Sequence, residues 1–398
     1  MSFPYPLRAG GKIRVYNLIK QLSKEYSITL LSLVTADEKR FVPELEKFCK
    51  RVETVPLAER GIHSLLHRLR CLVSMGMGMP AEMALKAYPA LDRMLNRVLS
   101  EERFDLIQVE HVQTLPYVLG RLEDINGNVL WVEHEVLHQR LFKRSEASKG
   151  FWRWFWRREA HLTREYEAAS ARRVQNAIVV SKEEAVCLCS WNPNLNIAVI
   201  PNGVDVAYYD AIHVEREPKS IIFTGWMRHF PNFNAANFLL KEIMPLIIQK
   251  MPDVRLYLVG DAIPDKIRFL AEKIPQVFLT GFVDDIRPFV KRASVAIVPL
   301  RIGGGTHLKV LEAMACRTLV VTTSVGAEGL PLRHGQHAWI SQDAKGLAEG
   351  VIRLLRDMEL RSTMITEARS LVEKEYDWAV IAAEQMAFYR DILKRHGQ

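Results

Sequence analysis

The sequence predicts an α/β protein made of two doubly wound domains, and three observations support this. The length of 398 residues exceeds what one ordinary core supports and suits two domains of about 150–200 residues each. Hydrophobic residues make up 48% and charged residues 25%, which is typical of a globular protein. Strand-length apolar runs alternate with helix-period segments throughout, as in parallel sheets with right-handed crossovers.

The predicted strands form two series, one in each half of the chain. The first series is Ile28–Leu33, Asp105–Val109, Val129–Val132 and Ala177–Val180, and the second is Ser220–Phe223, Val254–Val259, Val295–Val298 and Thr318–Val321. We therefore expect Rossmann-like domains at 1–204 and 205–375, with a helix at about 376–398 that packs back on the first. Ligands of such sheets bind beyond the carboxyl ends of the strands, so the expected site is the cleft between the domains.

The N-terminal segment predicts that the first domain lacks its first strand. Tyr5–Gly11 reads as a loop leading into a helix with apolar spacing at Val15, Leu18 and Leu22. A loop of this kind normally follows a strand, yet four residues precede Tyr5. The alternative, a domain that begins with a helix, stays open.

Charge and cysteine content restrict the classes of partner and compartment. The formal net charge of +8 favours anionic partners, either phosphorylated ligands or an acidic membrane face. Five cysteines without a C-x-x-C pair make a disulfide framework or a zinc site unexpected, which indicates a cytoplasmic protein. No apolar run is long enough for a membrane span, and no signal peptide is expected.

A glycine-rich loop is the strongest candidate for ligand binding. The strand ending at Pro299 is followed by Gly303, Gly304 and Gly305, and a helix is expected to begin near Thr306. Glycines let backbone N–H groups approach a phosphate, and a helix N-terminus adds partial positive charge. On that helix, Lys309 and Glu312 are three residues apart and share a face, which suits a cation for a pyrophosphate and a carboxylate for ribose hydroxyls. The alternative is a tight turn with an ordinary surface pair.

An ordered set of short motifs resembles the family 4 (group 1) retaining glycosyltransferases of GT-B fold. In the second half these are Val199–Asp205, Phe223–Gly225, Leu258–Gly260, Thr280–Asp285, Gly303–Ala315 and Ser324–Leu330. The N-terminal half matches more loosely, through Pro6–Gly11, Glu110–His111, Glu133–Glu135 and Val179–Ser181. The resemblance covers about residues 199–340 strongly.

The resemblance implies a donor site in the second domain and an acceptor site in the first. Glu312 corresponds to the carboxylate that holds the ribose, and we place Lys309 against the diphosphate by geometry. The amides of Gly303–Thr306 are expected to face the diphosphate and donor sugar, and Phe282 and Val283 the base.

In the first domain, the resemblance places Gly10 and Gly11 near the donor phosphate or acceptor. His134 matches a histidine close to the transferred sugar, and it also follows a predicted strand at the end facing the expected cleft. For His111, which follows Val109 similarly, a structural role and an acceptor contact remain equal alternatives. No metal site is expected, because Glu133–Glu135 places neighbours on opposite strand faces and no H-E-x-x-H occurs.

Two departures from the family pattern affect the donor contacts. Relatives often carry a glutamate eight residues before Glu312, where this chain has Gly304. They also often carry Arg and Lys six apart where this chain has Trp226 and Asn232. Arg228 is a candidate substitute for the missing cations.

An aromatic and basic segment, Phe151–Arg158, suggests contact with a membrane. Its aromatic side chains recur four apart, so apolar surface wraps much of the expected helix. This pattern suits an interface anchor for an enzyme with a lipid-linked acceptor, and equally a helix packed between the domains. Arg60–Leu72 is a second basic amphipathic stretch. No nucleic-acid-binding module is recognised.

The implied function is transfer of a sugar from a nucleotide-diphosphate sugar to an acceptor hydroxyl, with retention and without a metal or other cofactor. The expected setting is polysaccharide or glycolipid synthesis, in the cytoplasm or at the inner membrane face. The alternatives are an inactive nucleotide-binding or scaffold protein and, less favoured, a sugar-nucleotide epimerase. A Rossmann oxidoreductase is disfavoured, because no G-x-G-x-x-G follows a strand.

Overall fold

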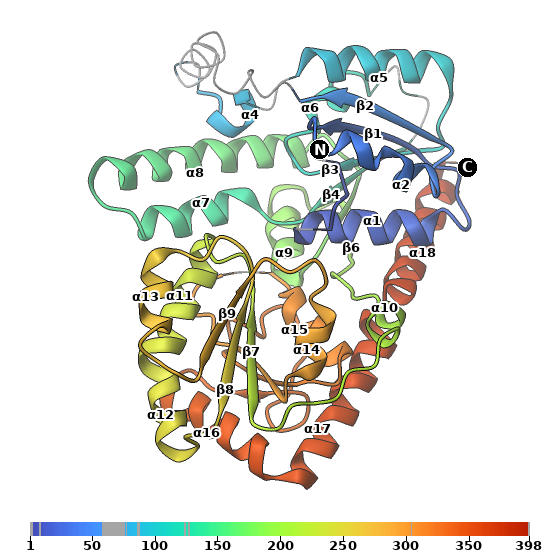
Figure 1. Ribbon diagram of the computed structural model, residues 1–398. Coiled ribbons are helices and arrows are strands. Elements are labelled where there is room, and N and C mark those ends of the chain that lie inside the picture. The colour runs from blue at the N-terminus through green and yellow to red at the C-terminus, as the bar shows by residue number, and fades with distance from the viewer. Residues whose placement is uncertain are drawn as a thin grey trace. The chain divides into compact units, whose positions relative to one another are not determined.

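The computed structural model describes residues 3–7, 9–57, 76, 78–85, 88–122, 125, 128–303 and 305–396 (Figure 1). The chain divides into a first unit, residues 1–201 and 382–398, and a second unit, residues 202–381. The division falls within α18 (Trp378–His396), whose residues from Ala382 onward belong to the first unit. Arg60–Leu72 lies outside the described residues.

The described strands of the first unit form two separate parallel sheets. The strands are β1 (Thr29–Val34), β2 (Arg51–Pro56), β3 (Leu106–Glu110), β4 (Asn128–Glu133), β5 (Asn176–Val179) and β6 (Asn196–Val199). One sheet is β1-β2 and the other is β3-β4-β5-β6. Among the described residues no strand joins β1 to β3.

The described part of the first unit also contains a series of helices. They are α1 (Gly10–Leu22), α2 (Val42–Glu46), α4 (Ala81–Leu85), α5 (Pro89–Glu101), α6 (Pro116–Leu119), α7 (Leu137–Glu146), α8 (Gly150–Ala171) and α9 (Lys182–Trp191), with a 3₁₀ turn η1 (Lys39–Phe41). In α1, the predicted apolar positions Val15, Leu18 and Leu22 are buried. The end of α18 also packs in this unit, where Gln385 Nε2 donates to Gln108 Oε1 at 3.1 Å.

The second unit holds one parallel sheet of six strands in the order β12-β11-β10-β7-β8-β9. The strands are β7 (Ser220–Thr224), β8 (Arg255–Val259), β9 (Val277–Gly281), β10 (Val295–Val298), β11 (Leu319–Thr322) and β12 (Trp339–Ile340). The helices are α10 (Val206–Asp210), α11 (Phe230–Phe238), α12 (Met244–Lys250), α13 (Asp265–Ala271), α14 (Arg287–Arg292), α15 (Leu308–Ala315), α16 (Ala344–Arg356) and α17 (Met358–Leu371), with π-helical turns η2 (Leu239–Ile243) and η3 (Val372–Tyr376). This strand order is that of a doubly wound Rossmann-like fold.

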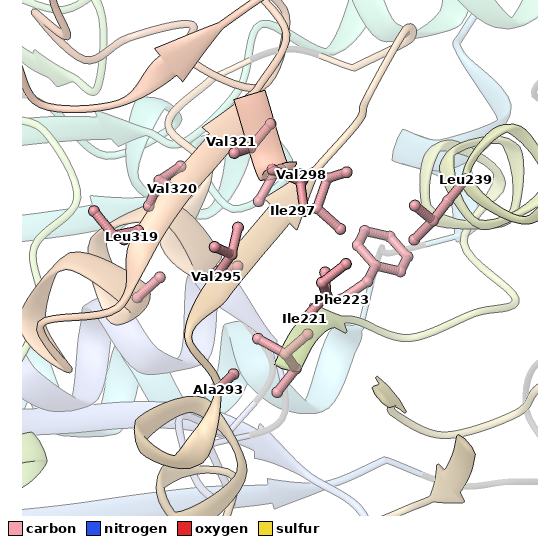
Figure 2. Packing of buried hydrophobic residues seen from close by; sticks show 14 of the residues in the cluster. Ile221, Phe223, Leu239, Ala293, Val295, Ile297, Val298, Leu319, Val320 and Val321 are labelled. Atoms are coloured by element: carbon pink, nitrogen blue, oxygen red, sulfur yellow. The ribbon is translucent and has the colours of Figure 1, made fainter. Parts of the chain in front are cut away.

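The core of the second unit is continuous across its central strands. Ile221 and Phe223 of β7, Val295 and Ile297 of β10, and Val321 of β11 are almost fully buried and pack together (Figure 2). Such strands are covered on both faces, which explains why they read as unbroken apolar runs in the sequence.

All eight predicted strands are present, each within one residue of its expected ends. The strands that the sequence did not single out are β2, β6, β9 and β12, most of whose residues are only half-buried. The helix expected near Thr306 begins two residues later, at Leu308.

Candidate functional site

In the second unit, the expected ligand crevice lies at the carboxyl ends of β7 and β10. These strands are neighbours in the sheet, but the chain leaves β7 toward α11 and β8, and leaves β10 toward α15 and β11. Strand order thus reverses between them, and ligands of open α/β sheets bind where this happens. The loops that border this point are 225–229 and 299–307.

Two glycines make close backbone approach possible beside this point. Gly225 has φ +155°, and a Cβ there would lie 2.7 Å from Asn232 Nδ2 and 3.1 Å from Lys309 Nζ. Gly260 has φ +150°, and its Cβ would lie 1.8 Å from the Gly225 carbonyl oxygen. A side chain at either position would displace the backbone or the lysine, so both positions require glycine.

Lys309 connects α15 to the end of β7. Its Nζ donates to the Thr224 carbonyl oxygen and to Asn232 Oδ1, both at 2.7 Å, and lies 4.7 Å from the centroid of the Phe223 ring. Burial lowers the pKa of Lys309 to about 8, although the nearby Glu312 carboxylate acts in the opposite direction. Because an ammonium has three N–H donors, one remains for a further acceptor. The Lys309 ammonium is therefore held by two uncharged acceptors at the point where the strand order reverses, here called the switch point.

Glu312 lies one helical turn further along α15 and is hydrogen-bonded by Tyr209 of α10. Burial raises the pKa of Glu312, whereas the Tyr209 hydroxyl and the Lys309 charge lower it. Burial and the Glu312 charge raise the pKa of Tyr209 well above its ordinary value, so its hydroxyl stays protonated and donates. A buried carboxylate with one fixed donor keeps lone pairs for further hydroxyl groups.

The glycine loop is described on both sides of Gly304, which itself lies outside the described residues. Gly303 and Gly305 have φ +157° and +74°. A Cβ on Gly303 would lie 3.2 Å from Cε1 of His307, the residue before α15. The Thr306 hydroxyl is buried and has no hydrogen-bond partner among the described residues. A buried hydroxyl in this state is commonly satisfied by water or a ligand.

The remaining donor-site candidates of the second unit follow the carboxyl ends of its strands, at the same edge of the sheet as these loops. Phe282 and Val283 directly follow β9; the Phe282 side chain is 50% exposed, and Val283 packs against the core. Arg228 is exposed in the loop after β7, as is Trp226. The structure gives Arg228 no contact with Lys309 or Glu312, and the cation that reaches Asn232 comes from α15 instead.

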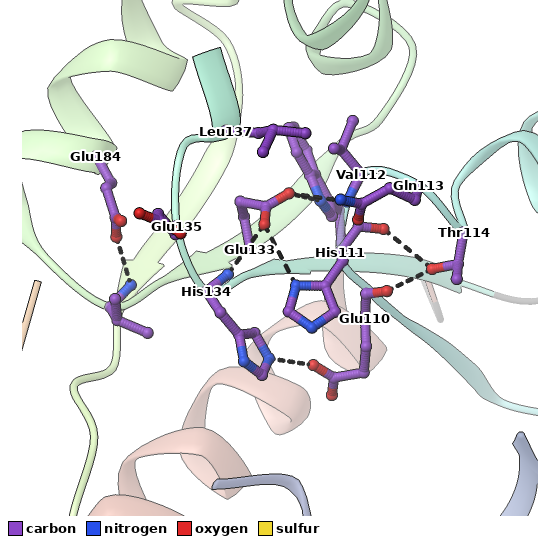
Figure 3. A network of polar contacts seen from close by, with 12 residues as sticks. Glu110, His111, Val112, Gln113, Thr114, Glu133, His134, Glu135, Leu137 and Glu184 are labelled. Atoms are coloured by element: carbon purple, nitrogen blue, oxygen red, sulfur yellow. Dashed lines mark hydrogen bonds and ion pairs between the residues drawn. The ribbon is translucent and has the colours of Figure 1, made fainter. Parts of the chain in front are cut away.

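In the first unit, two histidines lie at the ends of β3 and β4 (Figure 3). The rings of His111 and His134 are 4.2 Å apart between centroids. His134 Nε2 lies 2.5 Å from Glu110 Oε2, and a Cβ on Gly11 would lie 3.4 Å from His134 Nδ1. The predicted residues Gly11 and His134 are therefore brought together, at the N-terminus of α1, which begins at Gly10.

Glu133 organises the backbone around these histidines. Its carboxylate accepts from the Val112 N–H at 2.8 Å, the Trp131 Nε1–H at 3.2 Å and the His134 N–H at 3.1 Å, and lies 3.5 Å from His111 Nδ1. His111 itself has φ +67°, in the left-handed region that a non-glycine residue seldom adopts. Strained backbone of this kind persists where surrounding contacts fix it, here at the end of a strand.

The electrostatics favour a neutral imidazole beside an ionised carboxylate. Burial and the neighbouring His111 lower the pKa of His134, although Glu110 acts in the opposite direction. Burial acts to raise the pKa of Glu110, but the hydrogen bond from His134 and the charges of both histidines outweigh it, so this pKa is lowered. With Glu110 as an acceptor at Nε2, the Nδ1 atom next to Gly11 carries the lone pair.

Comparison with known proteins identifies the family. Residues 9–208 match the family described as Glycosyltransferase Family 4, and residues 218–357 match the one described as Glycosyl transferases group 1. The chain belongs to glycosyltransferase family 4. Both halves of the chain are thus covered by profiles of the same class of protein.

Several curated proteins are similar over part of the chain. A phosphatidyl-myo-inositol mannosyltransferase of Mycobacterium tuberculosis is 29% identical over 206 residues, 48% of this chain and 53% of the relative. An N-acetyl-alpha-D-glucosaminyl L-malate synthase of Bacillus anthracis is 24% identical over 222 residues, 51% of this chain and 55% of the relative. The chain spans about half the length of these curated relatives.

Among solved structures, similarity extends over almost the whole chain. HepE of Anabaena, in complex with UDP and glucose, has a TM-score of 0.70 at 15% identity and covers 98% of each chain. Sucrose-phosphate synthase of Thermosynechococcus elongatus has a TM-score of 0.69 at 17% identity, covering 97% of this chain and 94% of the other. At these identities the likeness establishes the fold alone, which is the GT-B fold.

The structure adds four residues to the candidate sites, each in contact with a residue named from the sequence: Asn232, Tyr209, Glu110 and Glu133. Asn232 stood out in the sequence only as a departure, whereas the structure makes it an acceptor for Lys309. Tyr209 carried no sequence signal, because its partner Glu312 lies 103 positions away (312 minus 209). Glu110 and Glu133 could have been found by their position beside each histidine at a strand end.

Proposed function

We propose that this protein transfers a sugar from a nucleotide-diphosphate sugar to an acceptor hydroxyl, with retention of anomeric configuration. The observation that carries the proposal is the placement of Lys309, Glu312 and the glycine loop at the switch point of the second unit. Membership of family 4 supports the same reaction class.

In this proposal the second unit binds the nucleotide. The third N–H of Lys309 and the amides around Gly303, Gly305 and Thr306 face the diphosphate, and the N-terminus of α15 adds partial positive charge. Glu312, held by Tyr209, accepts from the ribose hydroxyls. These groups are fixed before the reaction, so they stabilise the negative charge that develops on the departing diphosphate without reorganising. No divalent metal is required, because protein N–H groups and Lys309 take its place.

The first unit acts on the sugar and the acceptor. His134 is held by Glu110 and lies against Gly11, so its Nδ1 side is the one that faces a ligand entering beside the glycine pair. A neutral imidazole and its neighbouring carbonyl groups stabilise positive charge developing at the sugar carbon. The acceptor hydroxyl attacks from the face that the diphosphate leaves, and its proton passes to a departing phosphate oxygen.

The comparisons support a nucleotide diphosphate as the donor carrier, since HepE was solved with UDP and with UDP-glucose. The curated relatives include mannosyl, N-acetylglucosaminyl and capsular polysaccharide enzymes. On this basis we propose a role in polysaccharide or glycolipid synthesis.

We also propose that the hairpin of α7 and α8 contacts an anionic membrane surface, on the cytoplasmic side. Phe151, Trp152 and Trp154 are 65%, 58% and 60% exposed, and the Arg144 guanidinium lies 3.7 Å from the centroid of the Trp156 ring. From Lys149 through Arg158 every charged residue is basic. Exposed Trp and Phe mixed with Arg suit the headgroup region of a bilayer, where aromatic rings insert and cations meet lipid phosphates. No helix in the described part of the chain is long and apolar enough to span a bilayer.

The nucleotide proposal is tested by calorimetric titration of UDP, GDP, ADP and CMP into the parent protein and Glu312→Ala, without metal. We expect micromolar binding of one diphosphate, weakened at least tenfold in Glu312→Ala. Sugar transfer from the corresponding donor, measured with a panel of acceptors, then separates an active transferase from an inactive nucleotide-binding protein. Conversion of the donor without any acceptor would indicate an epimerase. Absence of binding to a folded sample would contradict the site assignment.

The membrane proposal is tested by co-sedimentation with vesicles. We expect the parent to sediment with phosphatidylglycerol-containing vesicles but not with pure phosphatidylcholine, and a Trp152→Ser, Trp154→Ser double variant to stay in the supernatant. A matched control is Phe269→Ser, which changes an aromatic side chain that is 57% exposed in the second unit. Equal sedimentation of the parent and the double variant would contradict a role for this hairpin.

A further inference from the structure

A buried chain of hydrogen bonds in the first unit leads from α18 to His134. Gln385 Nε2 of α18 donates to Gln108 Oε1 of β3 at 3.1 Å, and the Tyr389 hydroxyl donates to the same oxygen. Gln108 Nε2 donates to Glu110 Oε1 at 2.5 Å, and Glu110 Oε2 lies 2.5 Å from His134 Nε2. Direct contacts therefore connect α18 to the histidine of the candidate site.

The middle of this chain of hydrogen bonds lies along one face of β3. Gln108 and Glu110 are two residues apart on this strand, and side chains with that spacing point to the same face. Glu110 is the last residue of β3 and pairs with Val132 of β4, so its carboxylate lies near His134, which directly follows β4. One face of β3 thus carries the contact from α18 to the strand end.

Tyr389 and Gln385 are the polar members of the buried face of α18. They are 6% and 0% exposed, and Gln385 Nε2 also donates to the Tyr389 hydroxyl oxygen at 2.7 Å. Residues four apart lie on the same side of a helix, which explains this contact. The other buried residues of α18 in the first unit are apolar: Ala382, Met386 and Ile392. Apolar side chains of the same shape would fill the space at about equal stability, so the two polar side chains point to a role beyond packing.

The contacts of Gln108 fix the orientation of its side-chain amide. Its oxygen accepts from both donors of α18, so its nitrogen faces Glu110. A reversed amide would place its oxygen against the Glu110 carboxylate, and two acceptors without a shared proton repel each other in buried surroundings. Burial acts to raise the pKa of Glu110, whereas the hydrogen bonds from His134 and Gln108 lower it. The Gln108 N–H thus helps to keep Glu110 ionised and directed at His134.

We propose that Tyr389 and Gln385 are positioning residues for His134. They hold the Gln108 amide in one orientation, Gln108 fixes Glu110, and Glu110 fixes the imidazole ring beside Gly11. Both residues act through Gln108 and Glu110 rather than on a substrate. Their effect on sugar transfer rests on the proposed function, whereas their effect on the order of the His134 ring does not.

The test follows the proton on His134 Nε2 by NMR in full-length protein labelled with ¹⁵N-histidine, without substrate. The signal is assigned by its absence from His134→Ala. In a Tyr389→Phe, Gln385→Met double variant we expect this proton to exchange with water about tenfold faster, the factor that corresponds to the loss of one hydrogen bond of ordinary net strength. Tyr389→Phe alone removes a single oxygen atom and should accelerate exchange about threefold.

The matched control is Tyr26→Phe. The Tyr26 ring packs against Tyr389 at 5.5 Å between centroids, but its hydroxyl lies outside this chain of hydrogen bonds, so exchange should stay as in the parent. Unchanged exchange in the single and the double variant would overturn the proposal, as would an equal acceleration in the control.

A double-mutant cycle separates positioning from a general loosening of α18, and it needs only the single variants if the double variant fails to fold. Gln108→Leu breaks the chain of hydrogen bonds in its middle. Tyr389→Phe should therefore add less than about twofold to the exchange rate of Gln108→Leu. A full additional effect would show that Tyr389 acts on His134 by another route and would overturn the proposal.

Sugar transfer gives the functional readout. In the Tyr389→Phe, Gln385→Met variant we expect kcat to fall about tenfold while KM for the donor stays within about twofold, because the ring is misplaced and the nucleotide site is not. An unchanged kcat together with faster exchange would overturn the role of α18 in transfer. If the parent transfers no sugar, the proposed function fails, while faster exchange in the variants still supports the ordering of His134 by α18.

Discussion

The second unit has one continuous sheet of six strands, whereas the described strands of the first unit form two separate sheets. In the second unit, β7 and β10 pair directly, and the largest cluster of buried side chains runs across the whole sheet. In the first unit, the described core is divided between separate clusters on the β1 and β4 sides. Despite this difference both units concentrate polar groups at the carboxyl ends of their inner strands. The placement of polar groups at the strand ends therefore depends on the local strand-to-helix connections and does not require an uninterrupted sheet.

The largest expected effect concerns the cores themselves. Leu256 of β8 is fully buried in the complete sheet, and Leu256→Ala is expected to lower the free energy of unfolding of the second unit by about 2–5 kcal/mol. Leu30 of β1 is almost as buried but lines an apolar cavity of about 470 Å³ in the first unit, so Leu30→Ala should cost that unit about 2 kcal/mol or less. Amide exchange resolved by unit measures both values. Equal losses would show that the space beside β1 is packed in solution.

The next effect separates the chemical roles of the units. His134→Ala is expected to reduce sugar transfer about 100-fold, because stabilisation of the developing charge on the sugar is lost, while nucleotide affinity stays within about twofold. Glu110→Gln should reduce turnover less and shift its pH dependence, because the amide oxygen still accepts from His134 but no longer carries the charge that acts to raise the pKa of His134. His161→Ala, at an exposed position of α8, is the control. A His134 variant with full turnover would remove the first unit from the mechanism.

A substitution at Lys309 tests whether the second unit binds the nucleotide diphosphate. Lys309→Met keeps the length of the side chain but removes its charge, and we expect nucleotide diphosphate affinity to fall about 10- to 100-fold, the range of one or two charge-assisted hydrogen bonds. Lys345→Met, exposed on α16, is the matched control. Calorimetry checks both variants, and circular dichroism confirms that they fold. An unchanged affinity in Lys309→Met would mean that backbone amides alone hold the diphosphate.

The smallest expected effect is a pH dependence from the same lysine. With a pKa of about 8 in the free protein, Lys309 loses its charge as pH rises from 7 to 9, so diphosphate affinity should fall by up to about tenfold. Binding near pH 8.5 should take up protons, seen as a binding enthalpy that varies with buffer. The free energy of unfolding changes in the opposite direction. Because the pKa of Lys309 is lower in the folded than in the unfolded protein, the cost of burying its charge is relieved as pH rises above about 8. Lys309→Met should abolish the proton uptake.

The sequence was most informative where burial covers both faces of a strand. Central strands such as β7, β8 and β10 are mostly apolar, so runs rich in Val, Ile and Leu marked them within one residue. β2 and β6 were not singled out, because most of their side chains are half-buried and polar residues interrupt the apolar pattern.

For the candidate site, contiguous motifs could be predicted and distant pairs could not. The resemblance placed Gly11 near the donor phosphate or acceptor and His134 near the transferred sugar, and the structure brings these two residues together. The Asn232–Lys309 and Tyr209–Glu312 pairs join residues from different elements, and one sequence without homologues carries no record of such contacts. Arg228 stays a predicted donor contact, and the structure adds that Lys309 reaches Asn232 from a helix nearly eighty residues further along the chain.

The division of α18 has a consequence for how the protein is made. Residues 382–396 close the first unit, where Tyr389 and Gln385 meet Gln108, and the ribosome produces them after the whole of the second unit. The second unit, residues 202–381, is complete before them. Multidomain chains usually fold from the N-terminus as each domain emerges, at roughly 5–20 residues per second. Here the first unit cannot complete its packing until residues 382–396, which follow the second unit in the chain, have been synthesised.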